Sequence, residues 1–343
     1  MNKVKNQHFV PRCYLKNFTN ENEKINVFDK AKIQIRKNQN IENVASSRFF
    51  YDIDLDAIDK AFEKEGLAEI DNILPEEAKQ FFKKACEEQY IEKWFSEEIE
   101  PDLSECIKNL KGFYTLQRIS NIEKSLSISE GIKRRMSKLI AIQIVRSKEF
   151  RVTVIEQFPQ LQLEMIKAID RKEGKDIEWL KDVKADYKYP KEFVPILHAQ
   201  FIMDYDFICN LAEVLYKHIW YIGVNTTNKQ VYTSDNPIVK IEHKFDPIIS
   251  NEGIASPGIE IVYPLSNELI LIMKERYYHK TYEKYEMKYK ILNENEIEKY
   301  NYKQIIQSYR CVFSCDCKFD MEEEVLKRNP NLSKIDRMRI QVH

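Results

Sequence analysis

The sequence predicts an α+β protein in which a mostly antiparallel sheet packs against a large layer of helices. Apolar and polar residues alternate in several short stretches of the C-terminal half, a hairpin pattern lies near the N-terminus, and helical periodicity fills the region between them. We expect one domain over residues 1–343. Its parts are an N-terminal motif and hairpin (1–53), a helical layer (54–217), a sheet region (218–315) and a peripheral tail (316–343).

The composition supports a packed globular core and disfavours some function classes, although local charged patches remain open. Of the 343 residues, 43% are hydrophobic and 12% aromatic. The 54 Lys and Arg residues nearly balance the 55 Asp and Glu residues, so the formal charge of -1 provides no overall positive field that would attract nucleic acid or an anionic membrane. The 7 glycines form neither a GxGxxG nor a GxxxxGK[ST] pattern, which disfavours the common phosphate cradles of nucleotide-binding folds.

Cysteine usage and the N-terminus predict a cytoplasmic protein. The 7 cysteines are an odd number scattered along the chain, and the first residues lack the apolar segment of a secretory signal. Cys311, Cys315 and Cys317 lack the CxxC spacing of a zinc site, so we interpret them as buried thiols of a strand. No run approaches the roughly 20 apolar residues of a membrane span. We therefore expect no membrane partner.

The N-terminal stretch 7–18 combines an imidazole, a guanidinium and a phenol. His8, Arg12 and Lys16 recur every four residues, a spacing that places side chains on one face of a helix. Because Pro11 cannot lie inside a helix, we expect an extended segment up to Pro11 and a helix that begins there. His8 then lies just before a helix N-terminus. The alternative is an ordinary hydrogen-bonded core histidine.

The expected hairpin, 25–30 with 33–36, follows this motif, and 48–52 is expected to form a third strand. Helical spacing then runs from 54 to about 109. A central helix is predicted over 129–154, because its middle is apolar nearly all the way round.

Polar residues interrupt this central helix at Gln143, Arg146 and Arg151. A buried guanidinium needs a carboxylate, a carbonyl or a bound anion. The sequence leaves two interpretations open: an anion site, or an internal ion pair with a Glu of the preceding helices.

The C-terminal half changes period from helix to strand. The charged stretch 170–190 lacks periodicity and is interpreted as a linker or exposed excursion, and a helix follows up to about 217. Strands are expected over 218–224, 230–233, 259–263, 268–273, 287–291 and 311–314. The short connection 225–228 predicts that the first two of these strands pair antiparallel. Ser234, Asp235 and Asn236 then form an Asx-rich turn that presents a carboxylate at a strand end.

Four separated motifs together resemble one known family, a bacterial domain of unknown function numbered 4238. They are Gln7-His8-Phe9-Val10-Pro11-Arg12 followed by Tyr14-Leu15; Gln143-x-x-Arg146 with Arg151; Ser234-Asp235-Asn236-Pro237; and Tyr263-Pro264-Leu265-Ser266 followed by Asn301 and 309–314. Cys13 departs from the pattern, because a larger, usually aromatic residue is expected there. The family name carries no activity.

The resemblance implies that polar residues from distant stretches recur together, and a compact fold could bring them to one site. The expected catalytic residues are His8, which can move a proton near neutral pH, and Asp235, which can fix its tautomer. Arginines suit bidentate recognition of anions. The expected substrate-binding residues are Arg12, Tyr14, Gln143, Arg146, Arg151, Ser234 and Asn236.

This inventory suits phosphate esters better than acyl transfer, because no GxSxG elbow, SxxK pair or Cys-His signature is evident. The leading hypothesis is a phosphodiesterase-like or nuclease-like hydrolase that acts on nucleic acid or a nucleotide, of the kind bacteria keep for defence against phage. No HExxH motif or EF-hand loop marks a metal cage. Mg²⁺ held by one or two carboxylates and a substrate phosphate would leave little trace in the sequence.

A rival hypothesis belongs to another class: a non-catalytic sensor or interaction protein. In that case the same Arg and Asp residues form a buried ion-pair network that fixes the N-terminus to the central helix. The sequence gives no indication of oligomeric state.

Overall fold

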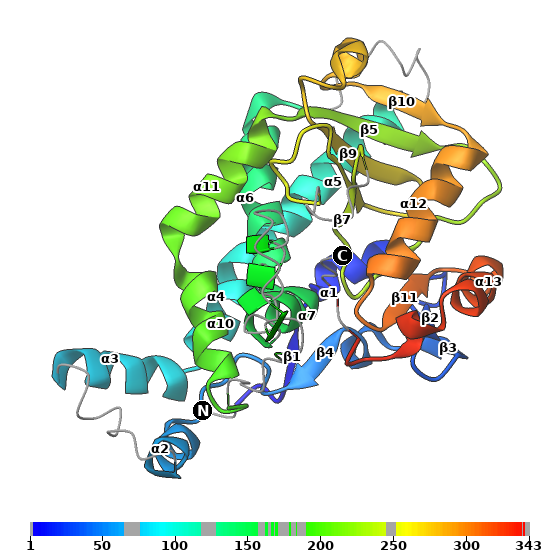
Figure 1. The fold of residues 1–343 in the computed structure, drawn as a ribbon. Coiled ribbons are helices and arrows are strands. Elements are labelled where there is room, and N and C mark those ends of the chain that lie inside the picture. Colours follow the sequence, from blue (N-terminus) through cyan, green and yellow to red (C-terminus); the bar gives the residue numbers. More distant parts are fainter. Residues whose placement is uncertain are drawn as a thin grey trace.

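The computed structural model describes residues 3–64, 76–117, 128–156, 190–244, 252–337 and 339, with single residues and pairs between 162 and 183. Its architecture confirms the predicted α+β class: most helices that precede residue 218 gather on one side of the molecule, and the two larger sheets lie on the other together with the C-terminal helices (Figure 1). None of the helices in the described ranges has both the length and the hydrophobicity that crossing a bilayer requires. The predicted linker, 170–190, lies largely outside the described residues.

The N-terminal motif folds as its proline predicts. The first elements are β1 (Asn6–His8), α1 (Arg12–Leu15), η1 (Lys16–Phe18), β2 (Ile25–Asp29), β3 (Gln34–Gln39), η2 (Ile41–Asn43) and β4 (Ser46–Arg48). Helix α1 begins directly after Pro11, and β2 pairs antiparallel with β3 as expected.

The third strand differs from the prediction, 48–52. Strand β4 lies between two residues with left-handed backbones, Ala45 at φ 51° and Phe49 at φ 50°, so it ends at Arg48. It pairs antiparallel with β1, where Ser46 is opposite His8. The strand that carries His8 therefore belongs to its own two-stranded sheet.

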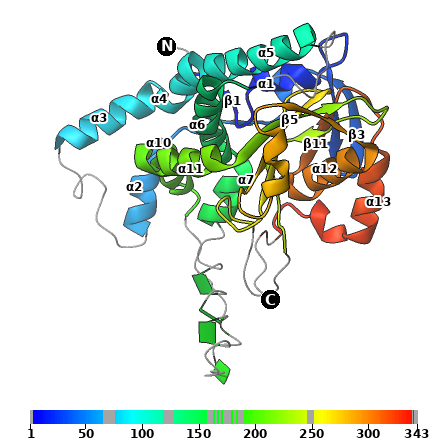
Figure 2. The same ribbon diagram turned by 90° about the horizontal axis from the view of Figure 1, so that it is seen from above.

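The helical layer surrounds the predicted central helix. Its elements are α2 (Leu55–Lys64), α3 (Glu76–Glu87), α4 (Tyr90–Trp94), the π-helical turn η4 (Phe95–Ile99), α5 (Glu100–Gln117), α6 (Glu130–Arg146), α7 (Lys148–Phe150), the π-helical turn η6 (Arg151–Glu156), α10 (Val194–Met203) and α11 (Tyr205–Lys217). Helix α6 packs against α5, α10 and α11 and lies between them in the view of Figure 2.

The central helix is shorter than the expected 129–154. It ends at Arg146 because Ser147 is extended, at φ -66° and ψ 151°. The Ser147 hydroxyl accepts a hydrogen bond from the Phe150 N–H (3.0 Å) and so caps a new helix. This break places Arg146 and Arg151 in two different helical segments.

Two sheets replace the single sheet that the sequence predicts. One has the order β10-β5-β9-β8-β7 and the other β3-β2-β11-β6. Their remaining strands are β5 (Ile219–Asn225), β6 (Thr233–Ser234), β7 (Val239–Ile241), β8 (Glu260–Pro264), β9 (Leu269–Lys274), β10 (Tyr289–Leu292) and β11 (Cys311–Ser314). They are accompanied by η7 (Lys280–Tyr285), α12 (Glu294–Gln307), α13 (Asp320–Arg328) and η8 (Pro330–Ser333).

The predicted hairpin across 225–228 is wrong. Strand β5 pairs antiparallel with β9 and parallel with β10, whereas β6 pairs with β11 of the other sheet. Asn301 of α12 provides the physical reason. Its side chain accepts from the Tyr232 N–H (2.9 Å) and donates to the Gln230 carbonyl (2.7 Å), so it satisfies backbone groups that a hairpin partner would otherwise bind.

A continuous cluster of buried apolar side chains joins these parts. It includes Tyr14 of the N-terminal motif, Ile140 of α6 and Trp220 of β5, all of which are fully buried. The N-terminal motif is thus packed between the helical layer and the sheets.

Candidate functional site

Tyr14 connects the N-terminal motif to both larger sheets. Its hydroxyl lies 2.6 Å from Thr233 Oγ1 in β6 and donates to the Pro264 carbonyl in β8 (2.7 Å). Its ring stacks on Tyr263, with centroids 5.0 Å apart. Burial raises the pKa of Tyr14 well above its ordinary value. Tyr14, predicted to bind substrate, is therefore enclosed by protein on all sides.

Arg146 is buried, with 1% of its surface exposed, and it binds the chain itself. Its Nη2 donates to the His8 carbonyl (2.5 Å) and to Glu100 Oε1 (3.1 Å), and its guanidinium lies 4.1 Å from the centre of the Phe95 ring. The Tyr51 hydroxyl lies within hydrogen-bond distance of the carbonyls of His8 and Arg146. Arg146 therefore has both a carbonyl and a carboxylate as partners within the protein, which is the arrangement that an internal ion pair requires.

Gln143, one turn before Arg146, holds the next residue of the motif. Its Nε2 donates to the Phe9 carbonyl (2.9 Å). Both side chains therefore bind the backbone at the end of β1, at His8 and Phe9. Gln143 Oε1 and the Nε and Nη1 atoms of Arg146 are buried and have no hydrogen-bond partner among the described residues.

Arg151 lies in a second buried group. Its Nε donates to His198 Nδ1 (2.9 Å), its Nη2 donates to the Phe50 carbonyl (2.5 Å), and its guanidinium covers the Phe50 ring at 3.6 Å. His198 Nε2 in turn donates to the Val145 carbonyl (2.7 Å). Burial and the neighbouring guanidinium lower the pKa of His198 well below its ordinary value, so the ring is neutral.

His8 and Arg12 lie together closer to the surface. His8 Nε2 is 3.3 Å from the Ile41 carbonyl, which makes it the donor and leaves the lone pair on Nδ1. Burial, followed by the charge of Arg12, lowers the pKa of His8. The Arg12 side chain is 54% exposed, and its guanidinium is 3.8 Å from Glu42. Among the predicted substrate-binding arginines, Arg12 is the one that solvent reaches.

Asp235 belongs to a different group, at the end of β6. Its Oδ2 accepts from the N–H groups of Arg310 (2.9 Å) and Cys311 (2.7 Å). Burial raises the pKa of Asp235 to about 6, against these bonds and the charge of Lys30. Within the described part of the chain, no hydrogen bond or ion pair joins Asp235 to His8, Arg12 or Arg146.

The neighbours of Asp235 bind helix α12. The Ser234 hydroxyl lies 2.7 Å from Gln304 Oε1, and Asn236 Nδ2 donates to the Gln307 carbonyl (2.9 Å). The turn predicted to present a carboxylate thus joins β6, α12 and β11. Its three polar side chains have internal partners.

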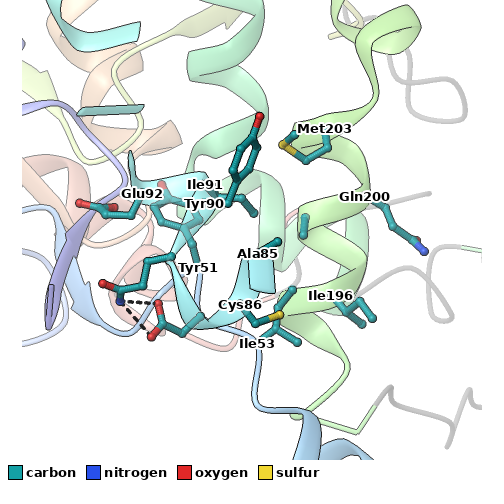
Figure 3. Close-up of a pocket in the computed structure, with 13 residues that line it drawn as sticks. Tyr51, Ile53, Ala85, Cys86, Tyr90, Ile91, Glu92, Ile196, Gln200 and Met203 are labelled. Carbon is teal, nitrogen blue, oxygen red and sulfur yellow. Dashed lines mark hydrogen bonds between the residues drawn. The ribbon is translucent and has the colours of Figure 1, made fainter. Parts of the chain in front are cut away.

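An open pocket of about 460 Å³ (Figure 3) shares Tyr51 with the Arg146 group. Its walls are the 51–53 segment, the end of α3, the start of α4 and one face of α10. Asp52, at its edge, accepts from Gln7 Nε2 (2.5 Å) and Gln89 Nε2 (2.8 Å). The backbone of Gln89 has a left-handed conformation, with φ 51°, in the turn that joins α3 to α4. The pocket therefore shares side chains with the network that holds β1.

Glu92 is the residue of this region that the sequence did not single out. It lines the pocket, and its Oε2 is a buried atom without a hydrogen-bond partner in the described structure. Burial raises the pKa of Glu92 to about 7, although Arg146 opposes the shift. In the sequence, Glu92 follows Ile91 and stands two positions before Trp94, which Phe95 follows. Many other glutamates of this region have similar neighbours, so this position alone did not distinguish it.

Metal-binding side chains are not grouped in the described residues: no three His, Cys, Asp or Glu side chains lie close enough to share an ion. The site instead consists of arginines and glutamines that bind the backbone of the N-terminal motif, next to an apolar pocket.

The fold and the site define an α+β protein with a buried polar network between its N-terminus and its helical layer. The chain belongs to the family described as Protein of unknown function (DUF4238), whose model matches residues 6–318. This range contains all four motifs and confirms the resemblance. No curated protein and no solved structure matches the chain.

Proposed function

We propose that this chain is a non-catalytic sensor or interaction protein, in which the buried polar network fixes the N-terminal motif to the helical layer. The observation that carries the proposal is the contact of Arg146 with the His8 carbonyl and Glu100. Both contacts use Nη2, so this nitrogen of the guanidinium is occupied by the protein itself. Gln143 supports the same assignment through the Phe9 carbonyl.

The pocket supplies the part of the molecule that a sensor requires. Tyr51 and Asp52 line it, and both bind the motif: the Tyr51 N–H donates to Gln7 Oε1 (2.6 Å), and Asp52 accepts from Gln7 Nε2. A molecule in the pocket would contact side chains that also hold β1. Binding there would then alter the stability of the N-terminal motif.

A phosphate-ester hydrolase is the second candidate, and Arg12 favours it, because its charge acts on both His8 and Glu92. A neutral His8 could accept a proton from attacking water, Arg12 could bind the phosphate, and protonated Glu92 could donate to the leaving oxygen. This candidate includes nucleic acid or a nucleotide as substrate, a phage-defence role and, where needed, Mg²⁺ bridging a carboxylate and the phosphate.

For either candidate we propose the cytoplasm as the compartment. All seven cysteines are free thiols, as expected where glutathione and thioredoxin keep proteins reduced.

Turnover assays separate the two candidates. Pure protein is incubated with labelled RNA, DNA and nucleotides, with and without Mg²⁺ or Mn²⁺, beside a His8→Ala variant. The sensor proposal predicts no turnover by either protein under any of these conditions. Turnover by the wild type that is lost in His8→Ala would overturn it in favour of the hydrolase, whereas equal turnover by both proteins would remove His8 from any catalytic role.

A further inference from the structure

We propose that the pocket between α3, α4 and α10 binds a neutral, mainly apolar small molecule. This inference rests on the proposed function, because it names the class of ligand that the sensor would detect. The volume of the pocket, its apolar wall and the pairing of its polar side chains indicate this class.

The size of the pocket suits a small organic molecule. An apolar cavity of about 150 Å³ accommodates benzene, and ligand pockets commonly span roughly 300–1,000 Å³. At about 460 Å³, this pocket has room for a body of two or three fused or linked rings, or for an alkyl chain of similar volume. It opens to solvent beside Tyr90 and Met203, which are 45% and 46% exposed.

Most of the wall is apolar. Ile196 and Met203 of α10 form one side, and Ile53 and Tyr90 lie on the other (Figure 3). The small side chain of Ala85 leaves space at the end of α3. These surfaces stabilise an apolar body through the area that it removes from water.

The polar side chains next to the N-terminal motif are already bound to the protein. Both carboxylate oxygens of Asp52 accept from Gln89 Nε2, at 2.8 and 3.0 Å. The same Gln89 side chain binds the main chain of Val4 through its Oε1 and Nε2 atoms. The Tyr51 hydroxyl lies within hydrogen-bond distance of two main-chain carbonyls. These three lining residues therefore have partners before any ligand enters.

The lining offers no further ionised side chain that a charged ligand could pair with. It contains no Lys, Arg or His. The carboxyl group of Glu92 lies on the side of α4 away from α10 (Figure 3), and its Oε2 atom is buried in the protein. Burial raises the pKa of the Cys86 thiol to about 11, so this group is neutral. A charged head group inside the pocket would lose hydration without gaining an ion-pair partner, whereas a neutral molecule avoids this cost.

Three probes with one naphthalene body test the charge of the ligand: 1-naphthylmethanol, 1-naphthylmethylamine and 1-naphthoate. Each is titrated into the full chain at pH 8 by isothermal titration calorimetry. We expect the alcohol to bind about tenfold more tightly than either charged probe, because only the charged probes lose ionic hydration. Glu92→Gln should leave all three affinities unchanged, since its carboxyl group faces away from the pocket.

A lysine placed in the wall should reverse this preference. In Ile196→Lys the new cation can pair with the carboxylate, so 1-naphthoate should gain about tenfold in affinity. Tyr205→Lys is the matched control, because Tyr205 is 67% exposed on α11 and lies outside the lining. It adds the same charge and should leave all three affinities unchanged.

Two variants that fill the pocket test the location. Ala85→Trp and Met203→Trp should each weaken the alcohol about tenfold while far-UV circular dichroism remains that of the wild type. If Ala85→Trp fails to fold, Met203→Trp on the partly exposed rim decides. A charged probe that binds as tightly as the alcohol, or binding that neither variant weakens, would overturn the proposal.

Hydrogen exchange separates the ligand class from the sensor function. The Tyr51 N–H donates to Gln7 Oε1, so a bound molecule that holds Tyr51 in place should slow amide exchange in β1. Binding of the alcohol without slower exchange in β1 would support the neutral ligand and contradict the sensor. If no probe binds while Arg146→Ala still loses stability, the neutral ligand is rejected and the structural network stands.

Discussion

At the scale of single residues, Arg146 and Arg12 make a matched pair, because both belong to the motifs but only Arg146 is buried. We expect Arg146→Ala to lower the free energy of unfolding by about 3–5 kcal/mol, since Glu100 and the His8 carbonyl both lose the guanidinium as a donor. Urea unfolding followed by circular dichroism measures the change.

Arg12→Ala is the control for this experiment. Its side chain is exposed and its ion pair with Glu42 is long, so its removal should change stability by less than about 0.5 kcal/mol. A midpoint for Arg146→Ala that equals or exceeds that of the wild type would contradict the structural network and favour an anion site at Arg146.

Because of Glu92, the stability of the folded protein should fall as the pH rises. Its pKa is raised from 4.5 to about 7 in the folded state, so the folded protein retains a proton that the unfolded chain loses. Its contribution to stability is therefore complete below pH 4.5 and is lost as the pH rises from about 4.5 to above 7. Glu92→Gln should match the wild type near pH 4 and exceed it at pH 8 by about 1–3 kcal/mol.

Thermal or urea unfolding of both proteins across this pH range measures the difference. Glu97→Gln, which removes an exposed carboxylate from η4, should follow the wild type at every pH. If the difference in stability between Glu92→Gln and the wild type does not grow with pH, Glu92 is already ionised in the folded protein at the lower end of this pH range.

Residue types predicted the chemistry of the site better than its geometry. That Arg146 needs a carbonyl or a carboxylate followed from the cost of burying a charge, and its contacts include one of each. Its particular partners, the His8 carbonyl and Glu100, depend on how three distant segments pack. The sequence also could not show that Asp235 binds a different part of the chain from His8. The N–H groups that Asp235 binds belong to residues 310 and 311, which are far from it in the sequence.

At the scale of elements, the Tyr14 hydroxyl joins the short helix α1 to both larger sheets. Tyr14→Phe would leave the Pro264 carbonyl and the Thr233 hydroxyl without this partner, at a cost of about 1–3 kcal/mol. Chemical unfolding should show this loss with an unchanged far-UV spectrum.

Tyr302→Phe is the matched control, since Tyr302 is 44% exposed on α12, and it should unfold like the wild type. Equal stability of the two variants would mean that α1 is held by its apolar contacts alone.

The positions of most elements followed from local sequence, whereas their partners did not. Pro11 sets the start of α1, and Asn293 caps α12 with a reciprocal bond to Glu296, as their residue types indicate. The partner of β6 is β11, which lies far along the chain, and the parallel pairing of β10 with β5 requires a long connection. The periodicity of a strand shows which face is buried but does not reveal its neighbour.

At the scale of the whole molecule, we expect residues 1–343 to unfold as one cooperative unit. The apolar cluster that includes Tyr14, Ile140 and Trp220 joins the N-terminal motif, the helical layer and the sheets. Calorimetric and van't Hoff enthalpies of unfolding should therefore agree, and fluorescence and circular dichroism should give the same midpoint. Limited proteolysis within 170–190 that yields two separately folded halves would contradict this prediction.

The order of strands in the β3-β2-β11-β6 sheet has a consequence for synthesis. Strand β2 lies between β3 and β11, and Asp29 at its end pairs with Arg310, 281 positions later in the chain. At about 5–20 residues per second, a ribosome takes roughly 15–55 s to cover that distance. Throughout this time, one edge of an apolar strand has no partner from its own chain.

We therefore expect β2 to stay open to protease until β11 emerges. Nascent chains halted before residue 300 should be cleaved by protease within 25–39, whereas released full-length chains should resist.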